Sequence, residues 1–180
     1  MPEVDRITES GKKAIAHLLN QSVQVEYGLI LNYPRILDQL TNIDRVSDEQ
    51  FTRDLERLGK ESFRHSGMVG KLIVQLGGEP QWEIEVIDRM IDVGNMLALQ
   101  LEKEKSALSI YQQAKLVAQQ NQARAKGFLG GLITWGGKES REFVSRSTVI
   151  NILNRLTSDE TGHIKLVERM ILELKKEPEQ

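Results

Sequence analysis

Glu160 and His163 stand three residues apart in a polar stretch near the C-terminal end of the chain, Ser158-Asp159-Glu160-Thr161-Gly162-His163-Ile164. On a helix, two residues three apart share one face. That face also carries the apolar residues that a helix would bury, namely Val149, Leu153, Leu156, Val167 and Leu174. Burying a carboxylate without a partner costs free energy. We therefore expect a metal ion at Glu160 and His163, with further ligands from other parts of the chain.

Four segments repeat apolar residues at helical spacing and are the elements that would position such ligands. They run over residues 3–40, from about 47 to 77, over roughly 85–120 and over 139–175. The first contains Pro34, which should kink the helix, and two separate helices are the alternative. Ser47-Asp48-Glu49-Gln50 has the form of a capping box that opens the second helix, and Gly77-Gly78 ends it. No strand pattern is apparent. Residues 1–180 are thus expected to form a single all-α domain, an antiparallel up-down-up-down four-helix bundle.

Each predicted helix carries polar side chains in the middle of its apolar stripe. They are Glu26 on the first helix, Glu61, Ser62 and His65 on the second, Gln100 and Glu104 on the third, and Glu160 and His163 on the fourth. A bundle brings the middles of its helices together, so these groups should converge. Carboxylates and imidazoles without thiolates suit iron, manganese or zinc. Carboxylates that bridge two ions would hold a pair able to activate oxygen or peroxide.

Composition excludes several other kinds of site. The chain has no cysteine, which rules out disulfides, thiolate zinc sites and iron–sulfur clusters. The formal net charge is −2 with the basic residues spread along the chain, so we expect no nucleic-acid partner. The N-terminus does not look like a signal peptide, and no apolar run is long enough for a membrane span. A cytoplasmic location is expected.

The chain resembles the ferritin-like superfamily, especially its bacterioferritin and rubrerythrin branch. The resemblance covers about residues 15–172, with the glycine-rich segment 127–137 as an insertion before the last helix. The stretches that carry it are Glu26 followed by Tyr33, His65 running on to Leu76-Gly77-Gly78-Glu79-Pro80, Leu97-Ala98-Leu99-Gln100-Leu101, and Asp159-Glu160-Thr161-Gly162-His163. Members of this superfamily take one glutamate from each of two helices and a Glu-x-x-His motif from each of the other two.

The resemblance implies metal ligands at Glu26, His65, Glu160 and His163. Ser62 stands where the second helix should carry a glutamate, and Gln100 stands where the third should. Glu61 and Glu104 are candidate substitutes, one residue and one turn away. The resemblance also implies iron as the metal, with manganese or zinc as alternatives. Haem is not expected, because Phe63 replaces the methionine of the haem-carrying members.

Two functional hypotheses follow from these observations. The first is a non-haem metal protein that oxidises ferrous iron or reduces oxygen or peroxide. The second is a non-catalytic bundle with a degraded metal site that acts as a binding or structural protein. A homodimer or small homo-oligomer is expected in either case, with the apolar residues of segment 127–137, Trp135 among them, as the subunit contact.

Overall fold

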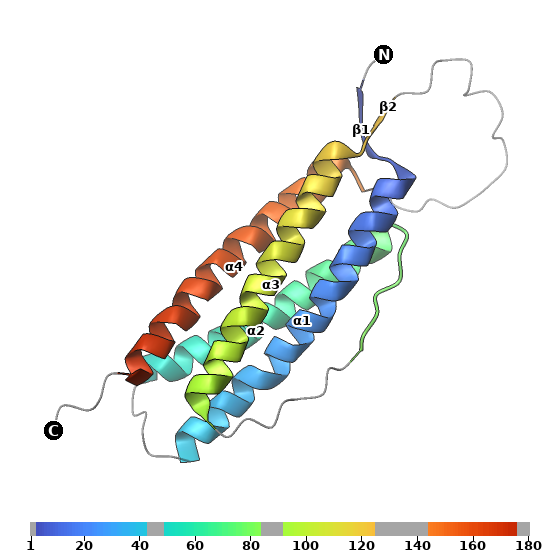
Figure 1. Ribbon diagram of the computed structural model, residues 1–180. Helices are drawn as coiled ribbons and strands as arrows, with labels where there is room; N and C mark the ends of the chain where they lie inside the picture. Colours follow the sequence, from blue (N-terminus) through green and yellow to red (C-terminus); the bar gives the residue numbers. More distant parts are fainter. Residues whose placement is uncertain (1–2, 43–48, 84–91, 125–143, 176–180) are drawn as a thin grey trace, which may run out of the picture.

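The computed structural model describes residues 3–42, 49–83, 92–124 and 144–175, which form a bundle of four long helices (Figure 1). α1 packs against α2 and α3, and α3 also packs against α4. The expected all-α bundle is confirmed, and α1 continues as one helix through Pro34. In chain order the elements are β1 (Glu3–Ile7), α1 (Glu9–Asn42), α2 (Glu49–Gln75), α3 (Val93–Gln120), β2 (Gln122–Arg124) and α4 (Arg146–Lys175).

Two apolar clusters lie at opposite ends of the bundle and show the direction of each helix. One cluster takes the N-terminal halves of α1 and α4 and the C-terminal halves of α2 and α3, and the other takes the opposite halves. α1 and α4 therefore run in one direction, and α2 and α3 run in the other (Figure 1). The marker residues are Ile15, Leu76, Ala118 and Val149 in the first cluster, and Leu40, Phe51, Val93 and Met170 in the second.

This arrangement differs from the strict up-down-up-down order expected from the sequence. The reason is the length of the connection between α2 and α3, which spans residues 76–92 and joins opposite ends of the bundle. Seventeen extended residues reach about 55 Å, whereas a helix as long as α3 measures about 42 Å. α3 begins at Val93 because Asp92 caps it, its carboxylate accepting the backbone N–H of Asn95 at 2.8 Å. The part of the predicted helix at 85–91 lies outside the described residues.

The two ends of this connection follow ordinary capping rules. Gly77 adopts a φ of 84°, the left-handed conformation that glycine accepts without strain. Its N–H bonds to the carbonyl of Val74 at 2.9 Å, and the N–H of Gly78 bonds to that of Ile73 at 2.9 Å. This pair of bonds is a Schellman motif, so the predicted glycine stop of the second helix is confirmed.

The expected helix over residues 3–8 is wrong, because Glu3–Ile7 is a strand that pairs antiparallel with β2. α1 begins only after Thr8, whose hydroxyl accepts the N–H of Gly11 at 3.1 Å and so caps the helix. α4 likewise begins later than expected, at Arg146, with the hydroxyl of Ser145 accepting the N–H of Thr148. Ser47 of the predicted capping box and the segments 127–137 and 139–143 lie outside the described residues.

None of the described helices combines the length and the hydropathy that a membrane crossing requires.

Candidate metal centre

Five side chains from all four helices meet halfway along the bundle, between the two apolar clusters. Glu26 comes from α1, His65 from α2, Glu104 from α3, and Glu160 and His163 from α4. Each is at most 2% exposed. Their positions on the apolar stripes of long helices explain this convergence, because the packing that buries the stripes also carries these polar residues into the core. The expected convergence is therefore present in the fold.

The Nδ1 atoms of both histidines face the buried carboxylates. His65 Nδ1 lies 2.8 Å from Glu160 Oε1 and 3.5 Å from Glu26 Oε1. His163 Nδ1 lies 3.3 Å from Glu104 Oε2 and 3.4 Å from Glu160 Oε2. The two imidazole rings stack with centroids 5.3 Å apart. Glu160 is thus shared between both histidines, and donor atoms of His65, Glu160 and His163 all lie within 4.8 Å of one another.

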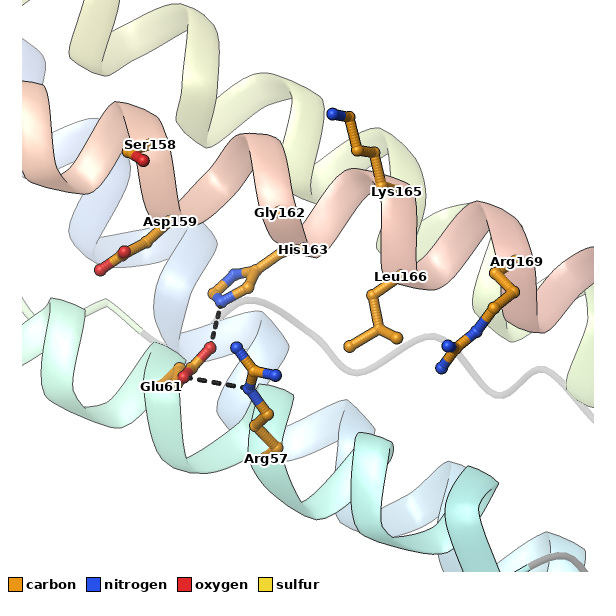
Figure 2. A pocket seen from close by; sticks show the side chains of 9 residues that line it. All are labelled: Arg57, Glu61, Ser158, Asp159, Gly162, His163, Lys165, Leu166 and Arg169. Atoms are coloured by element: carbon orange, nitrogen blue, oxygen red, sulfur yellow. Dashed lines mark hydrogen bonds and ion pairs between the residues drawn. The ribbon is translucent and has the colours of Figure 1, made fainter.

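The Nε2 atoms of the same histidines contact a second pair of carboxylates, farther from the centre. His65 Nε2 lies 3.2 Å from Asp159 Oδ2, and His163 Nε2 lies 2.7 Å from Glu61 Oε2. Figure 2 shows Glu61 on α2 and His163 on α4 pointing toward one another. A carboxylate at Nε2 accepts the proton carried there, which leaves the Nδ1 lone pair free to bind a metal. Asp159 and Glu61 therefore orient the imidazoles.

Two buried tyrosines hold two of the carboxylates from opposite sides. The hydroxyl of Tyr33 on α1 donates to Glu104 Oε1 on α3 at 2.5 Å. The hydroxyl of Tyr111 on α3 donates to Glu26 Oε1 on α1 at 2.7 Å. Each tyrosine thus fixes the glutamate of the other helix. The partner of Glu26 is Tyr111 rather than Tyr33, since Tyr33 bonds to Glu104 instead.

These contacts make the site approximately two-fold symmetric. The same symmetry is found in the spacing of residues along the sequence. α1 and α3 each carry a glutamate followed seven residues later by a tyrosine. α2 and α4 each carry an acidic residue four positions before a histidine. This repeated spacing could have identified Tyr111 and Asp159, two residues that were not among the expected site residues. The matching pairs are Glu26 with Glu104, Tyr33 with Tyr111, His65 with His163, and Glu61 with Asp159.

Glu104, and not Gln100, is the carboxylate that α3 brings to the centre. Gln100 accepts a hydrogen bond from Asn32 Nδ2 at 3.4 Å and donates one to the carbonyl of Met96 at 3.2 Å, so its amide is engaged elsewhere. The assignment of Gln100 as the counterpart of a family ligand is therefore corrected. Ser62 remains the one departure, because it occupies on α2 the place that Glu160 occupies on α4.

Several buried atoms at this centre lack a hydrogen-bond partner within the described part of the chain. They are Glu26 Oε2, Ser62 Oγ, His65 Nδ1 and both carboxylate oxygens of Glu160. The short approach of His65 Nδ1 to Glu160 Oε1 does not have hydrogen-bond alignment. Buried polar atoms are normally satisfied, so a group of unsatisfied atoms needs an explanation. Oxygen and imidazole nitrogen donors are the ligands that iron, manganese and zinc accept, and these residues fit such an ion.

The pKa values of the metal-free protein are consistent with a cation site among these residues. Burial lowers the pKa of His65, but its contacts with Glu160 and Glu26 outweigh burial and raise that pKa to about 10. For His163, burial is likewise outweighed by Glu104 and Glu160, and the pKa rises to about 11. Burial raises the pKa of Glu160 to about 8. Protons thus neutralise the buried carboxylates when no metal cation does so.

The third histidine of the chain lies apart from the centre. His17 is exposed on α1, and its Nε2 lies 3.4 Å from the amide nitrogen of Gln21.

Comparisons with known proteins identify the fold. No protein-family model matches the chain, and no curated protein matches it either. Solved structures do match. A ferritin-like diiron-carboxylate protein from Bacillus anthracis is 20% identical, with 89% of this chain and 97% of that chain covered and a TM-score of 0.64. The bacterioferritin of Desulfovibrio desulfuricans, described with a diiron site, is 16% identical, with coverage of 93% and 83% and a TM-score of 0.65. Rhodobacter capsulatus bacterioferritin, described with a metal-free dinuclear site and haem iron, is 18% identical, with coverage of 88% and 84% and a TM-score of 0.59.

Proposed function

Starting from the ferritin-like fold of this chain, we propose that it is a non-haem metal protein whose centre binds one or two metal ions in the middle of the bundle. The proposed ligands are Glu26, His65, Glu104, Glu160 and His163. Iron is the proposed metal, and manganese or zinc would use the same donors. The observation that carries the proposal is the convergence of three buried carboxylates and two imidazole nitrogens. Several of their atoms have no hydrogen-bond partner within the part of the chain that the structure describes.

The protein residues around the centre would each have a defined task. Glu160 lies between both histidines and would hold the metal together with them. Glu61 and Asp159 orient the imidazoles from outside through Nε2. Tyr33 and Tyr111 hold the carboxylates of Glu104 and Glu26 in place.

We propose that the bound metal supplies redox chemistry, either the oxidation of ferrous iron or the reduction of oxygen or peroxide. The test is to add ferrous iron without oxygen, then admit oxygen or peroxide and follow ferric absorbance. The wild-type protein should oxidise iron at least about tenfold faster than a protein-free blank, a difference of about 1.4 kcal/mol in barrier. Glu104→Ala and Glu160→Ala should remove this acceleration, and His17→Ala should retain it.

A non-catalytic bundle is the alternative function, and Ser62 is the residue that favours it, because it replaces a carboxylate that a full di-iron set would contain. If ferrous iron binds but neither oxygen nor peroxide oxidises it faster than the blank, this alternative replaces the redox proposal.

We also propose that a second copy of the chain binds the outer face of α1 and α2. A mainly apolar groove of about 470 Å³ lies there, lined by residues such as Tyr33, Leu37 and Leu55. Phe63 lines the same groove and is 70% exposed, so one face offers both a protruding ring and a hollow to receive it. Such a surface is self-complementary about a two-fold axis. Segment 127–137, the subunit contact expected from the sequence, lies outside the described residues.

Light scattering behind size-exclusion chromatography tests this contact. Phe63→Glu should convert a dimer into a monomer, while Leu116→Glu, at a residue 53% exposed on α3, should leave the dimer unchanged. A monomeric wild-type protein would contradict the proposal.

A further inference from the structure

Ser62 is a fully buried serine at the edge of the candidate metal centre. Its side chain is 0% exposed, and its hydroxyl has no hydrogen-bond partner among the described residues. Leaving a buried hydroxyl unpaired is unfavourable. It lies one helical turn before His65 on the same face of α2. The hydroxyl is therefore a donor available to a ligand at the centre.

Comparison of α2 with α4 shows what is missing beside this serine. α4 presents Asp159, Glu160 and His163 in the order acid, ligand, histidine, and α2 presents Glu61, Ser62 and His65 at the same spacing. The two acids and the two histidines make equivalent contacts. Only the middle position differs, with a carboxylate on α4 and a short hydroxyl on α2.

The charge of the donor set is one unit short for the same reason. Glu26, Glu104 and Glu160 supply three negative charges, whereas two divalent ions carry four positive charges. A fourth carboxylate at position 62 would have balanced them. A buried net charge is costly, so a site with two ions should recruit an anion.

Resting on the metal-binding function proposed above, we propose that the Ser62 side of the centre binds a small monoanionic carboxylate from solution. This ligand would take the place opposite Glu160 and accept a hydrogen bond from the Ser62 hydroxyl. The protein would then act on, or be controlled by, a small organic acid at its metal centre.

A groove between α2 and α4 gives such an anion a route toward the centre. Its volume is about 510 Å³, and Glu61 and His163 line it where the two helices face each other (Figure 2). Three basic side chains, Arg57, Lys165 and Arg169, line the groove together with two acidic ones, Glu61 and Asp159. Arg57 pairs with Glu61, and Arg169 pairs with Asp54. The basic groups of the lining outnumber the acidic ones, which favours entry of an anion.

Two details shape this groove. The backbone of Gly162 faces open space, since a Cβ placed there would meet no atom within 4 Å. α2 and α4 also pack together much less closely than the other neighbouring helices do.

Glu61 is the residue of this chain that could supply the missing carboxylate, but its contacts hold it away from that position. One of its oxygens accepts from His163 Nε2 at 2.7 Å and the other from Arg57 Nε at 3.2 Å. Because the two nitrogens of an imidazole point away from each other, Glu61 lies on the outer side of His163. Two partners already hold it there, and neither of them is Ser62.

The test uses cobalt(II) as a spectroscopic metal and sodium acetate as the carboxylate, with sodium chloride at equal ionic strength as the control. Acetate should change the visible spectrum of the cobalt-loaded wild-type protein and tighten cobalt binding at least tenfold. Ser62→Glu should bind cobalt tightly in chloride and show no response to acetate. Ser62→Ala should keep the response but need several-fold more acetate. His17→Ala, at an exposed residue of α1, should leave the response unchanged.

The outcomes separate this inference from the proposed function. Cobalt binding to the wild type that is the same in acetate and in chloride would overturn the anion site and leave the metal centre standing. No cobalt binding to the wild type under either condition would overturn both proposals.

Discussion

At the scale of single residues, some ligands of the centre could be predicted from the sequence, whereas several contacts between them could not. Glu26, His65, Glu160 and His163 were predictable because each interrupts an apolar stripe. The choice between Gln100 and Glu104 was not predictable, since both face inward and only the packing of α1 decides which one meets a partner. The bond from Tyr111 to Glu26 joins residues 85 positions apart, which helical periodicity cannot show.

The two tyrosines should contribute equally to stability if the approximate two-fold symmetry is real. We expect Tyr33→Phe and Tyr111→Phe each to lower the free energy of unfolding of the metal-free protein by about 2 kcal/mol, because each removes a buried hydrogen bond to a carboxylate. Urea denaturation measures this. Tyr27→Phe, at a half-buried tyrosine packed edge-on against Trp82, is the control and should change stability by less than about 0.5 kcal/mol. A large effect from one tyrosine alone would argue against the symmetric arrangement.

The stability of the metal-free protein should fall as pH rises from about 6.5 to about 10. The pKa values of His65 and His163 are raised to about 10 and about 11, so across this range the folded protein holds more protons than the unfolded chain. Their contribution is complete below pH 6.5 and is lost as pH rises through the folded-state values. Urea unfolding at pH 6.5 and pH 9 measures this difference.

His163→Gln should flatten the pH dependence, and His17→Gln should not. With saturating zinc, the free energy of unfolding should instead rise with pH, because metal binding displaces the same protons. A metal-free protein that grows more stable toward pH 9 would contradict the assigned contacts.

At the scale of elements, the apolar stripes predicted four helices and most of their buried residues. α2 follows its expected stripe throughout, with Phe51, Leu58, Val69 and Leu72 all buried. The ends of the helices were less predictable, because caps such as Thr8 and Asp92 act through single hydrogen bonds that a periodic pattern does not register. Asp92 caps α3 at Val93, and α3 runs parallel to α2 because the chain between the two helices reaches the opposite end of the bundle.

Substitutions at two glycines test how closely other residues pack against α1 and α2. A Cβ at Gly11 of α1 would lie 2.6 Å from Asn121 Cβ and 2.8 Å from Ile7 Cγ2, which is too close for any real contact. Gly11→Ala should therefore destabilise the protein by about 1–3 kcal/mol. Gly67 of α2 has open space around it, so Gly67→Ala should stabilise by up to about 1 kcal/mol through helix propensity. Thermal unfolding compares the two. Equal effects of the two substitutions on thermal stability would contradict the close contacts of Gly11 at the β1 end of α1.

At the scale of the whole molecule, the bundle consists of two apolar clusters with a polar layer between them. The clusters contain core residues at 0–7% exposure, whereas the layer between them holds carboxylates with unsatisfied atoms. A domain stabilised by its apolar ends can tolerate an unfavourable centre. A ligand that binds only the folded state then adds stability that rises with the logarithm of its concentration. The bundle could be predicted from the sequence because its periodic stripes are local. The missing carboxylate at position 62 becomes apparent only when the sequence of α2 is compared with that of α4.

Metal content measured after anaerobic reconstitution tests the central claim most directly. The protein is loaded with ferrous iron, freed of excess metal by gel filtration without chelator, and analysed by mass spectrometry of the elements. The wild type should retain between about one and two iron ions per chain, and Glu160→Ala should retain less than a tenth of that amount while remaining folded. A wild-type protein that retains no iron, manganese or zinc under these conditions would contradict the account.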